Sequence, residues 1–280
     1  MPAEATLTVK QILSEPGAPV IVFDHVQLAF DDFVVLKDVS FTVLKGHTKI
    51  ILGASGSGKS TSLKIITGLL KADAGVVWVN GQRVDELTES QIMAVRTDLG
   101  LIFQEGALFD SLTVRENVGY KLYEESDMPL EQVDKRVEEV LGFIGLLEQM
   151  DKMPSELSGG QRRRVAIARA MAFKPSIMLY DEATTGLDPI TAITVNDEMV
   201  KLRDLEGVSS VIVTHQLRDA FYVATHMAVR EGGQVRIVEA TPGKEREAEF
   251  MMLREGVIVF EGDADALRHA TDPYIKEFLS

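Results

Sequence analysis

Residues 49–61 read KIILGASGSGKST, and this stretch sets the fold of the surrounding chain. Residues 49–52 form a short apolar run rich in β-branched side chains, which predicts a buried strand. Gly53–Ser60 fits the pattern G-x-x-x-x-G-K-[ST], and the apolar spacing of residues 60–70 predicts a helix after it. A strand, a glycine-rich loop and a helix in this order predict a loop that binds phosphate.

In such a loop the backbone N–H groups converge on phosphate oxygens, and the N-terminus of the helix adds its dipole. Lys59 is expected to reach the β and γ phosphates of a nucleotide, and the Ser60 hydroxyl is expected to bind Mg²⁺. The residues expected to contact the nucleotide here are Gly53, Ala54, Ser55, Gly56, Ser57, Gly58, Lys59, Ser60 and Thr61. The loop alone is compatible with a kinase, a GTPase or an ATPase.

Composition limits the partners of the 280-residue chain. Its formal net charge of −14 disfavours broad binding to nucleic acid, so we expect no nucleic-acid partner. It has no cysteine, which excludes disulfides and thiolate sites. The start of the chain does not resemble a secretory signal, and no run of about 18 apolar residues suits a bilayer span. We therefore expect a cytosolic protein whose membrane role would depend on a partner.

The remaining pattern indicates an α/β fold with additions. Residues 1–19 are predicted to be an N-terminal extension, and an apolar stripe over residues 133–147 predicts a helix within a mostly helical region. From His226 onward the pattern predicts strands, with a turn at residues 231–233. Alternation of strands with helices indicates a mainly parallel sheet. Further strands are predicted at residues 20–23, 39–43, 176–180 and 210–213.

Two acidic residues follow the apolar run of residues 177–180. Asp181 and Glu182 are expected at the carboxyl end of a parallel strand, where open α/β sheets bind ligands. Asp181 would hold Mg²⁺ through water, and Glu182 could accept a proton from the water that attacks the γ-phosphate. Two solvated acids at a strand end are the alternative interpretation.

A second candidate anion site lies at Leu157–Gln161. Ser158 is a good N-cap, and Gly159 and Gly160 leave N–H groups exposed at the positive end of the next helix. One domain with one γ-phosphate has little use for two such sites. We therefore hypothesise that this site serves ATP bound to a second copy packed head to tail. An ordinary N-cap turn remains the alternative.

These motifs together resemble the ATP-binding cassette (ABC) ATPases, whose pattern is present in order across residues 20–280. The resemblance implies a P-loop NTPase (RecA-like) core, an antiparallel β subdomain, and an inserted helical subdomain at about residues 105–164. It implies a Mg-dependent ATPase that works as a homodimer. The residues matched to the family's signature motif are Leu157, Ser158, Gly159, Gly160 and Gln161.

The resemblance also implies individual roles around the nucleotide. Phe30 matches the ring that stacks on adenine, with Phe33 as a rival. Gln104 matches the glutamine that senses Mg²⁺ and the attacking water, and His215 matches the γ-phosphate histidine. Asp181 and Glu182 match the magnesium aspartate and the catalytic glutamate, and Asp188 matches the loop that communicates across the dimer.

Two further features of the sequence lie next to the family motifs: an alanine in place of the usual proline, and a run of three arginines. Ala183 stands where the family usually has proline, which removes no catalytic group. Residues 162–164 are three arginines, which we expect to form a solvated or ion-paired helix face.

A single cassette without a coiled-coil insertion is similar to the ATPase subunits of transporters. Such subunits bind a membrane permease through a groove near the glutamine loop, where Ala107–Phe109 would provide apolar contacts. Packing of these residues in the core of the helical region is the alternative. A non-transport cassette ATPase with soluble assembly partners, or a non-enzymatic nucleotide sensor, would be other functions. The intact catalytic set argues against the sensor.

Four stretches resemble the Mla/Mce-type phospholipid transport ATPases (MlaF-like): residues 106–114, 153–160, 188–191 and 271–279. The resemblance implies a peripheral subunit on the cytoplasmic face of the inner membrane. It also implies an MlaE-like permease and, indirectly, an Mce/MlaD-like lipid-binding protein. The ATPase of another ABC importer or exporter is the alternative. Residues 231–250 depart from the family as an insertion, which we expect to form an extended hairpin.

Overall fold

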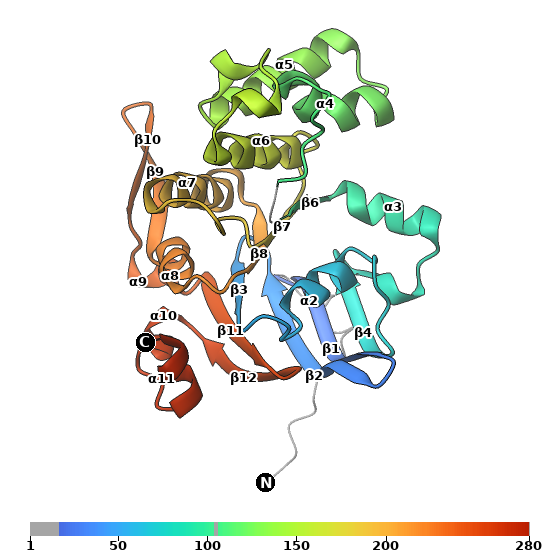
Figure 1. Cartoon of the computed structure of the whole chain (residues 1–280), viewed down its shortest axis with the longest axis vertical. Coiled ribbons are helices and arrows are strands. Elements are labelled where there is room, and N and C mark those ends of the chain that lie inside the picture. The colour runs from blue at the N-terminus through green and yellow to red at the C-terminus, as the bar shows by residue number, and fades with distance from the viewer. Residues whose placement is uncertain (1–16, 104–105, 280) are drawn as a thin grey trace.

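The structure is a computed structural model that describes residues 17–103 and 106–279. Figure 1 shows sheets and their flanking helices in the larger part of the molecule, with a group of helices at the opposite end. The chain is therefore an α/β protein with a separate helical region, as the sequence predicts.

The larger sheet has strand order β12-β11-β3-β8-β7-β6. All neighbours pair in parallel except β12, which pairs antiparallel with β11. Every residue of β3 and β8 is buried, which explains their lack of polar and apolar alternation. The strands predicted at residues 49–52, 176–180 and 210–213 are confirmed. The bounds are β3 (Thr48–Leu52), β6 (Leu99–Ile102), β7 (Ile177–Asp181), β8 (Ser209–Val213), β11 (Ala248–Arg254) and β12 (Val257–Gly262).

A second, antiparallel sheet has strand order β2-β1-β4-β5. The strands predicted at residues 20–23 and 39–43 lie within its longer strands β1 and β2. One apolar core joins this sheet to the larger one, with helix α2 contributing Leu63, Ile65 and Ile66. The phosphate loop leads into α2 and therefore lies on a rigid support. The bounds are β1 (Pro19–Phe30), β2 (Phe33–Leu44), β4 (Ala74–Val79), β5 (Gln82–Arg83) and α2 (Lys59–Ile66).

The remaining helices divide between the two parts of the molecule in Figure 1. Helices α4, α5 and α6 gather at the end away from the second sheet, and their apolar faces share one core with β7 and α7. The bounds are α3 (Glu89–Thr97), α4 (Val114–Glu125), α5 (Leu130–Phe143), α6 (Gly159–Met171), α7 (Pro189–Glu206), α8 (Leu217–Thr225), α10 (Ala264–Arg268) and α11 (Pro273–Leu279).

The helix predicted from the stripe at residues 133–147 ends earlier than expected. Helix α5 stops at Phe143, and Gly145 follows with a φ of 66°, the left-handed conformation that ends many helices. Leu147 lies in a separate 3₁₀ turn and is 44% exposed. The stripe thus predicts the buried face of α5 correctly, but the range 133–147 extends four residues beyond the end of the helix.

The expected hairpin at residues 231–250 is shorter and begins earlier. Strands β9 (His226–Glu231) and β10 (Gln234–Glu239) form an antiparallel pair, with Gly232 and Gly233 at positive φ in the predicted turn. The chain then forms the short helix α9 (Pro242–Glu245), because Pro242 at the first helical turn ends strand pairing. The hairpin lies beside α7 in Figure 1.

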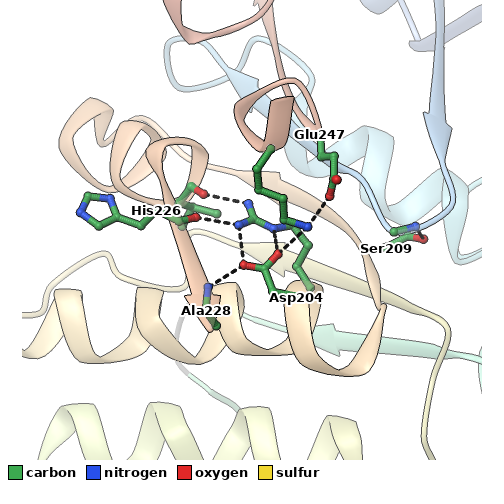
Figure 2. A network of polar contacts seen from close by, with 9 residues as sticks. Asp204, Ser209, His226, Ala228 and Glu247 are labelled. Carbon is green, nitrogen blue, oxygen red and sulfur yellow. Dashed lines mark hydrogen bonds and ion pairs between the residues drawn. The ribbon is translucent and has the colours of Figure 1, made fainter. Parts of the chain in front are cut away.

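A buried polar network fastens this hairpin and α9 to the end of α7 (Figure 2). Asp204 accepts hydrogen bonds from Arg203, from the Ala228 amide at 2.8 Å, and from Lys244 at 2.9 Å. Arg203 also donates to the carbonyl oxygens of Val223 at 2.9 Å and His226 at 2.7 Å. These contacts link α7, α8, β9 and α9 through the Arg203–Asp204 pair, so they fix the path of the chain into β11.

Candidate active site

The phosphate loop requires glycine at two positions where a side chain would have no space. Gly53 has a φ of 149°, and an added Cβ would lie 2.3 Å from the carbonyl oxygen of Leu253. Gly58 has a φ of 104°, and its Cβ would lie 2.6 Å from Cδ2 of Leu36. The loop thus packs directly on β11 and β2, and its backbone can approach a ligand closely.

Lys59 lies across the inside of this loop and is 6% exposed. Its Nζ donates to the carbonyl oxygens of Gly53 at 2.8 Å and Ala54 at 2.9 Å. Burial lowers the pKa of Lys59, while the charges of Glu182 and Asp181 oppose that change. The ammonium group of Lys59 is thus held beside the backbone of the glycine loop. This position suits the binding of a triphosphate, whose negative charge needs a compensating cation.

Ser60 and Asp181 bring two oxygen ligands together. The Ser60 hydroxyl donates to Oδ1 of Asp181 at 2.7 Å, linking the first turn of α2 to the last residue of β7. Burial raises the pKa of Asp181, and the hydrogen bond from Ser60 opposes that rise. No cluster of three or more carboxylate or imidazole side chains suited to a metal occurs in the described ranges. The pair fits Mg²⁺, which commonly takes few protein oxygens and completes its shell with phosphate and water.

Glu182 follows Asp181 in a backbone conformation that is rare for its type. Its φ is 53°, in the left-handed region, which costs about 1 kcal/mol or more for a residue with a Cβ. Its N–H donates to the carbonyl oxygen of Val213 at 2.9 Å, which holds this turn against the end of β8. The strained turn directs the carboxylate to the end of the parallel strands, where ligands bind.

Two side chains hold the Glu182 carboxylate. Nδ1 of His215 lies 2.9 Å from Oε1 and 2.8 Å from Oε2, and the Thr185 hydroxyl donates to Oε2 at 2.7 Å. The His215 side chain is 52% exposed, whereas the Glu182 side chain is 13% exposed. The carboxylate is thus partly desolvated and oriented on both oxygens, as a general base requires.

A cleft of about 660 Å³ opens in front of the loop. Phe30 and Phe33, which are 48% and 65% exposed, both line it, together with Val35 from β2. Both aromatic rings are thus available to stack on adenine, and the lining of the cleft does not distinguish Phe30 from Phe33. The predicted residues that line the cleft are Phe30, Ala54, Ser55, Gly56, Gly58, Lys59, Ser60, Thr61, Glu182 and His215.

The turn at Leu157–Gln161 forms a complete helix cap. Ser158 Oγ accepts from the Gln161 amide at 3.3 Å, and Gln161 Oε1 accepts from the Ser158 amide at 2.8 Å. Gly160 packs so tightly that an added Cβ would lie 2.0 Å from Cγ2 of Thr191 on α7. The expected N-cap is therefore present, and the second glycine is required by close contact between α6 and α7.

Asp188 caps α7 and is linked to the same contact. Its carboxylate accepts from the amides of Ile190 and Thr191 at 3.1 Å each, and from the Thr191 hydroxyl. The Thr191 hydroxyl is the main cause that lowers the pKa of Asp188. Thr191 thus contacts both the Leu157–Gln161 turn and the Asp188 loop, so these two predicted elements form one surface.

The structure therefore brings most, but not all, of the predicted site residues together. Gly53 and Asp181 contact the cleft residues Lys59 and Ser60, and Ser57 lines an adjoining cavity of about 500 Å³. Neither Leu157–Gln161 nor Asp188 is among the described residues that line the cleft. Gln104 lies outside the described residues.

A family model described as ABC transporter matches residues 36–185, more than half of the chain. The chain belongs to the ABC transporter family. The matched range includes the phosphate loop, the Ser158 turn and Glu182, so the family rests on the residues whose geometry is given above. ABC cassettes bind and hydrolyse ATP with Mg²⁺, and this chain is accordingly an ATPase.

Two curated relatives of this ABC chain differ in the molecule that appears in their names. The chain is 37% identical over 269 residues to the chloroplast protein TRIGALACTOSYLDIACYLGLYCEROL 3 of Arabidopsis thaliana, covering 90% of this chain and 71% of that one. It is 41% identical over 198 residues to a methionine import ATP-binding protein, MetN, of Carboxydothermus hydrogenoformans, covering 71% of this chain. The chain spans 58% of the length of that MetN protein.

A solved structure supports the ABC fold. The ATP-binding cassette MJ0796, in a dimeric post-hydrolysis state bound to ADP and Pi, matches with a TM-score of 0.70 and 29% identity. The match covers 87% of this chain and 98% of that one. The predicted ABC ATPase fold is confirmed.

The expectation that residues 162–164 form a solvated or ion-paired helix face is wrong for Arg163, although Arg162 is exposed. Arg163 is 7% exposed and donates to the carbonyl oxygens of Phe103 at 2.9 Å and Thr185 at 3.3 Å. It is therefore buried at the junction of three segments and not part of a solvated face. Sequence reasoning also missed Thr185, which contacts Glu182, and Gln216, which contacts Thr185. Hydroxyl and amide side chains next to a catalytic motif are the signal that could have identified them.

Proposed function

We propose that this chain hydrolyses ATP as one of two identical subunits, each supplying its Leu157–Gln161 turn to the nucleotide of the other. The observation that carries the proposal is the position of that turn, which lies outside the residues lining the chain's own cleft. Ile190, two residues after Asp188, is an apolar side chain that is 80% exposed, and a second copy would cover it. The dimeric state of MJ0796 supports this arrangement.

In this proposal the residues of one cleft divide the work of hydrolysis. ATP would supply the phosphoanhydride bond, and a bound Mg²⁺ would neutralise the charge of the triphosphate. Lys59 would bind the β and γ phosphates, and Ser60 and Asp181 would hold the ion. Glu182 accepts a proton from the attacking water, and His215 orients Glu182 beside the γ-phosphate. The role of Gln104 toward Mg²⁺ and water rests on the family resemblance.

The test of this assignment is Glu182→Gln in the full chain. We expect phosphate release to fall by about 10² to 10⁴-fold, since a general base contributes that much, while ATP binding is retained. Lys59→Ala is the matched comparison, because it should weaken ATP binding itself. Near-normal turnover by the Glu182→Gln variant would refute the assignment.

We further propose that a membrane permease docks on the loop that carries Ala107–Phe109. Phe109 is 43% exposed and packs on Tyr120, which is 41% exposed, while Leu108 packs against the apolar core. Core packing, the alternative drawn from the sequence, thus applies to Leu108 only. Ala107 and Phe109 present an apolar surface to a partner.

Hydrogen bonds from two side chains fix the backbone of this loop. Asn117 is fully buried, and its amide donates to the carbonyl oxygens of Phe109, Leu112 and Thr113 at 3.0 Å each. It also accepts from the Phe109 amide at 2.8 Å. Arg169 donates to the carbonyl oxygen of Ala107 at 2.9 Å. Because the backbone is held at both ends, the exposed ring of Phe109 is preorganised for binding.

A single charge tests the docking surface. Phe109→Asp should abolish co-purification of a multi-span protein from detergent extracts while the isolated chain still binds ATP. Leu130→Asp is the matched control, because Leu130 is 69% exposed on α5, outside this loop. Equal loss in both variants, or retention in both, would contradict the proposed surface.

We propose phospholipid as the cargo of the complex, with an MlaE-like permease and an Mce/MlaD-like lipid-binding protein as partners. Two observations support it: the four stretches that resemble Mla/Mce ATPases, and a relative named for a glycolipid that aligns over 90% of this chain. Methionine or another amino acid is the second candidate, because MetN is 41% identical over 71% of the chain.

The two cargoes are distinguished by transport. The tagged chain, purified from its own cells with the proteins it retains, is reconstituted into liposomes with a fluorescent phospholipid or with radiolabelled methionine. ATP-dependent movement of phospholipid alone supports the lipid proposal. ATP-dependent movement of methionine alone overturns it in favour of the second candidate.

The membrane location follows from the proposed permease. Among the described residues, no helix has both the length and the apolar character needed to cross a bilayer. We propose a peripheral position on the cytoplasmic face of the inner membrane. Release of the chain from membranes when Phe109→Asp removes the docking surface would support this position, and unchanged membrane association would contradict it.

A further inference from the structure

Thr185 contacts the Glu182 carboxylate, but the proposed mechanism gives Thr185 no role. Its hydroxyl donates to Oε2 of Glu182 at 2.7 Å, and its own backbone N–H donates to the Glu182 carbonyl oxygen at 3.1 Å. Thr185 is half-buried and is not among the residues that line the cleft. Any effect of Thr185 on hydrolysis therefore acts through Glu182 and not through contact with ATP.

Gln216 supports the direction of this hydrogen bond, in which the ionised Glu182 carboxylate can only accept. Its side-chain amide donates to Oγ1 of Thr185 at 3.3 Å. A threonine hydroxyl has one proton to donate, and its oxygen can accept from another donor. Because Gln216 occupies the accepting side, the proton of Thr185 points to Glu182. Thr185 thus holds Oε2 of the carboxylate, while Nδ1 of His215 lies within hydrogen-bond distance of both Oε1 and Oε2.

Arg163 connects this arrangement to helix α6. From the second turn of α6, its guanidinium donates to the carbonyl oxygen of Thr185 at 3.3 Å and to that of Phe103 at 2.9 Å. A planar guanidinium holds two acceptors in a fixed relative position, which a flexible ammonium does not. The helix that begins with the signature turn therefore also holds the backbone next to the hydroxyl that orients Glu182.

We propose that Thr185 is a positioning residue for Glu182 and that Arg163 couples it to the signature helix α6. The inference rests on the proposed role of Glu182 as general base. Small displacements of a catalytic group are costly, since about 1 Å can reduce turnover by about 10²-fold. If α6 binds the nucleotide of a second copy, Arg163 transmits the position of that helix to the chain's own Glu182.

The hydroxyl is tested by Thr185→Val and Thr185→Ser in the full chain, with Mg-ATP hydrolysis measured as kcat and KM. We expect Thr185→Val to lower kcat by about 10- to 100-fold and to change KM by less than about twofold. Thr185→Ser keeps the hydroxyl and should stay within about twofold of the wild-type kcat. A merely structural role would not separate kcat from KM or be rescued by serine.

Thr184→Val is the matched control, because it makes the same threonine-to-valine change one residue away. Thr184 is buried, at 4% exposed. We expect its kcat to stay near the wild-type value. The inference is overturned if Thr185→Val keeps normal kcat, if Thr185→Ser is as slow as Thr185→Val, or if Thr184→Val is equally slow.

A double variant separates this inference from the proposed role of Glu182. If Thr185 acts through Glu182, adding Thr185→Val to Glu182→Gln should slow turnover little further. If the fold-losses of the two single variants multiply in the double variant, the inference about Thr185 is overturned, but the general-base role of Glu182 is not. Normal turnover in Glu182→Gln would remove the general-base assignment and the inference together.

Arg163→Lys tests the link to α6. Lysine keeps the charge but cannot hold both carbonyl oxygens in the same geometry. We expect kcat to fall by at least about fivefold with KM little changed, in protein whose Tm shows that it is folded. A normal kcat in folded Arg163→Lys would overturn the coupling to α6.

Discussion

The Ser60 hydroxyl donates a 2.7 Å hydrogen bond to Oδ1 of Asp181, joining residues 121 positions apart in the chain. The contact closes the end of the parallel sheet around the phosphate loop. It places two candidate oxygen ligands side by side, and their chain neighbours are the buried Lys59 and the carboxylate of Glu182. The proposed chemistry depends on this convergence of α2 and β7.

Loss of the Ser60 oxygen should weaken the metal site. We expect Ser60→Ala to raise the Mg²⁺ concentration for half-maximal ATP hydrolysis by about tenfold or more, the equivalent of about 1.4 kcal/mol. A Mg²⁺ titration of phosphate release measures this change. Ser62→Ala is the control, because Ser62 is fully buried and its hydroxyl donates to the carbonyl oxygen of Gly58, the residue just before α2. Equal Mg²⁺ dependence in both variants would contradict the assignment of Ser60.

The two aromatic side chains at the mouth of the cleft give a second prediction. Stacking of a base on an aromatic ring contributes about 1–3 kcal/mol. We expect Phe30→Ala to raise the KM for ATP by about tenfold and Phe33→Ala to raise it by less than about threefold. The reverse order would assign the adenine to Phe33.

Close packing between α6 and α7 gives a third prediction. Gly160→Ala places a Cβ 2.0 Å from Cγ2 of Thr191, so we expect it to lower the free energy of unfolding by about 1–3 kcal/mol. Denaturant unfolding measures the loss, and Gly160→Ala combined with Thr191→Ala should recover part of it. Gly142→Ala on α5 is the control, since nothing lies within 4 Å of its added Cβ. A Gly160→Ala variant as stable as Gly142→Ala would contradict the close packing.

Asp204 gives a prediction about pH. Burial would raise its pKa, but hydrogen bonds and charges from Arg203, the Ala228 amide and Lys244 outweigh burial and hold the pKa below the ordinary value. A depressed folded-state pKa stabilises the fold above the unfolded pKa of about 3.9, and this stabilisation is lost as the pH falls through the folded value.

We therefore expect Asp204→Asn to lower the free energy of unfolding at pH 7 by about 3–5 kcal/mol, because it leaves buried Arg203 without its carboxylate. The difference from wild type should shrink as the pH falls below the unfolded pKa of about 3.9 toward the lower folded value. Asp265→Asn, at a carboxylate that is 76% exposed, should change stability by less than about 0.5 kcal/mol. A pH-independent loss in Asp204→Asn would contradict the ionised state of this network.

The sequence predicts the parts of this molecule that depend on local pattern. The buried runs at residues 50–52 and 177–180 stand out because parallel strands covered on both faces carry few polar residues. Ser158 is recognisable as an N-cap because its partner Gln161 is three residues away.

The features that the sequence does not predict are of two kinds. Some depend on contacts between residues far apart in the chain, and others are strands or helices with an atypical local sequence. Arg163 is 60 residues from Phe103, and Gln216 is 31 residues from Thr185, so neither contact follows from spacing. Strand β4 was missed because its six residues begin with Ala74 and Gly75, which are poor strand formers. Helix α9 interrupts the expected hairpin because proline starts it.

The central claim is that two chains complete each other's catalytic centres. The most direct measurement is the mass of the Glu182→Gln variant in solution, by analytical ultracentrifugation, with and without saturating ATP. We predict one chain without ATP and a species of twice that mass with ATP, which should not form when Ser158→Arg is added. A Glu182→Gln protein that binds ATP and remains a single chain would contradict the account.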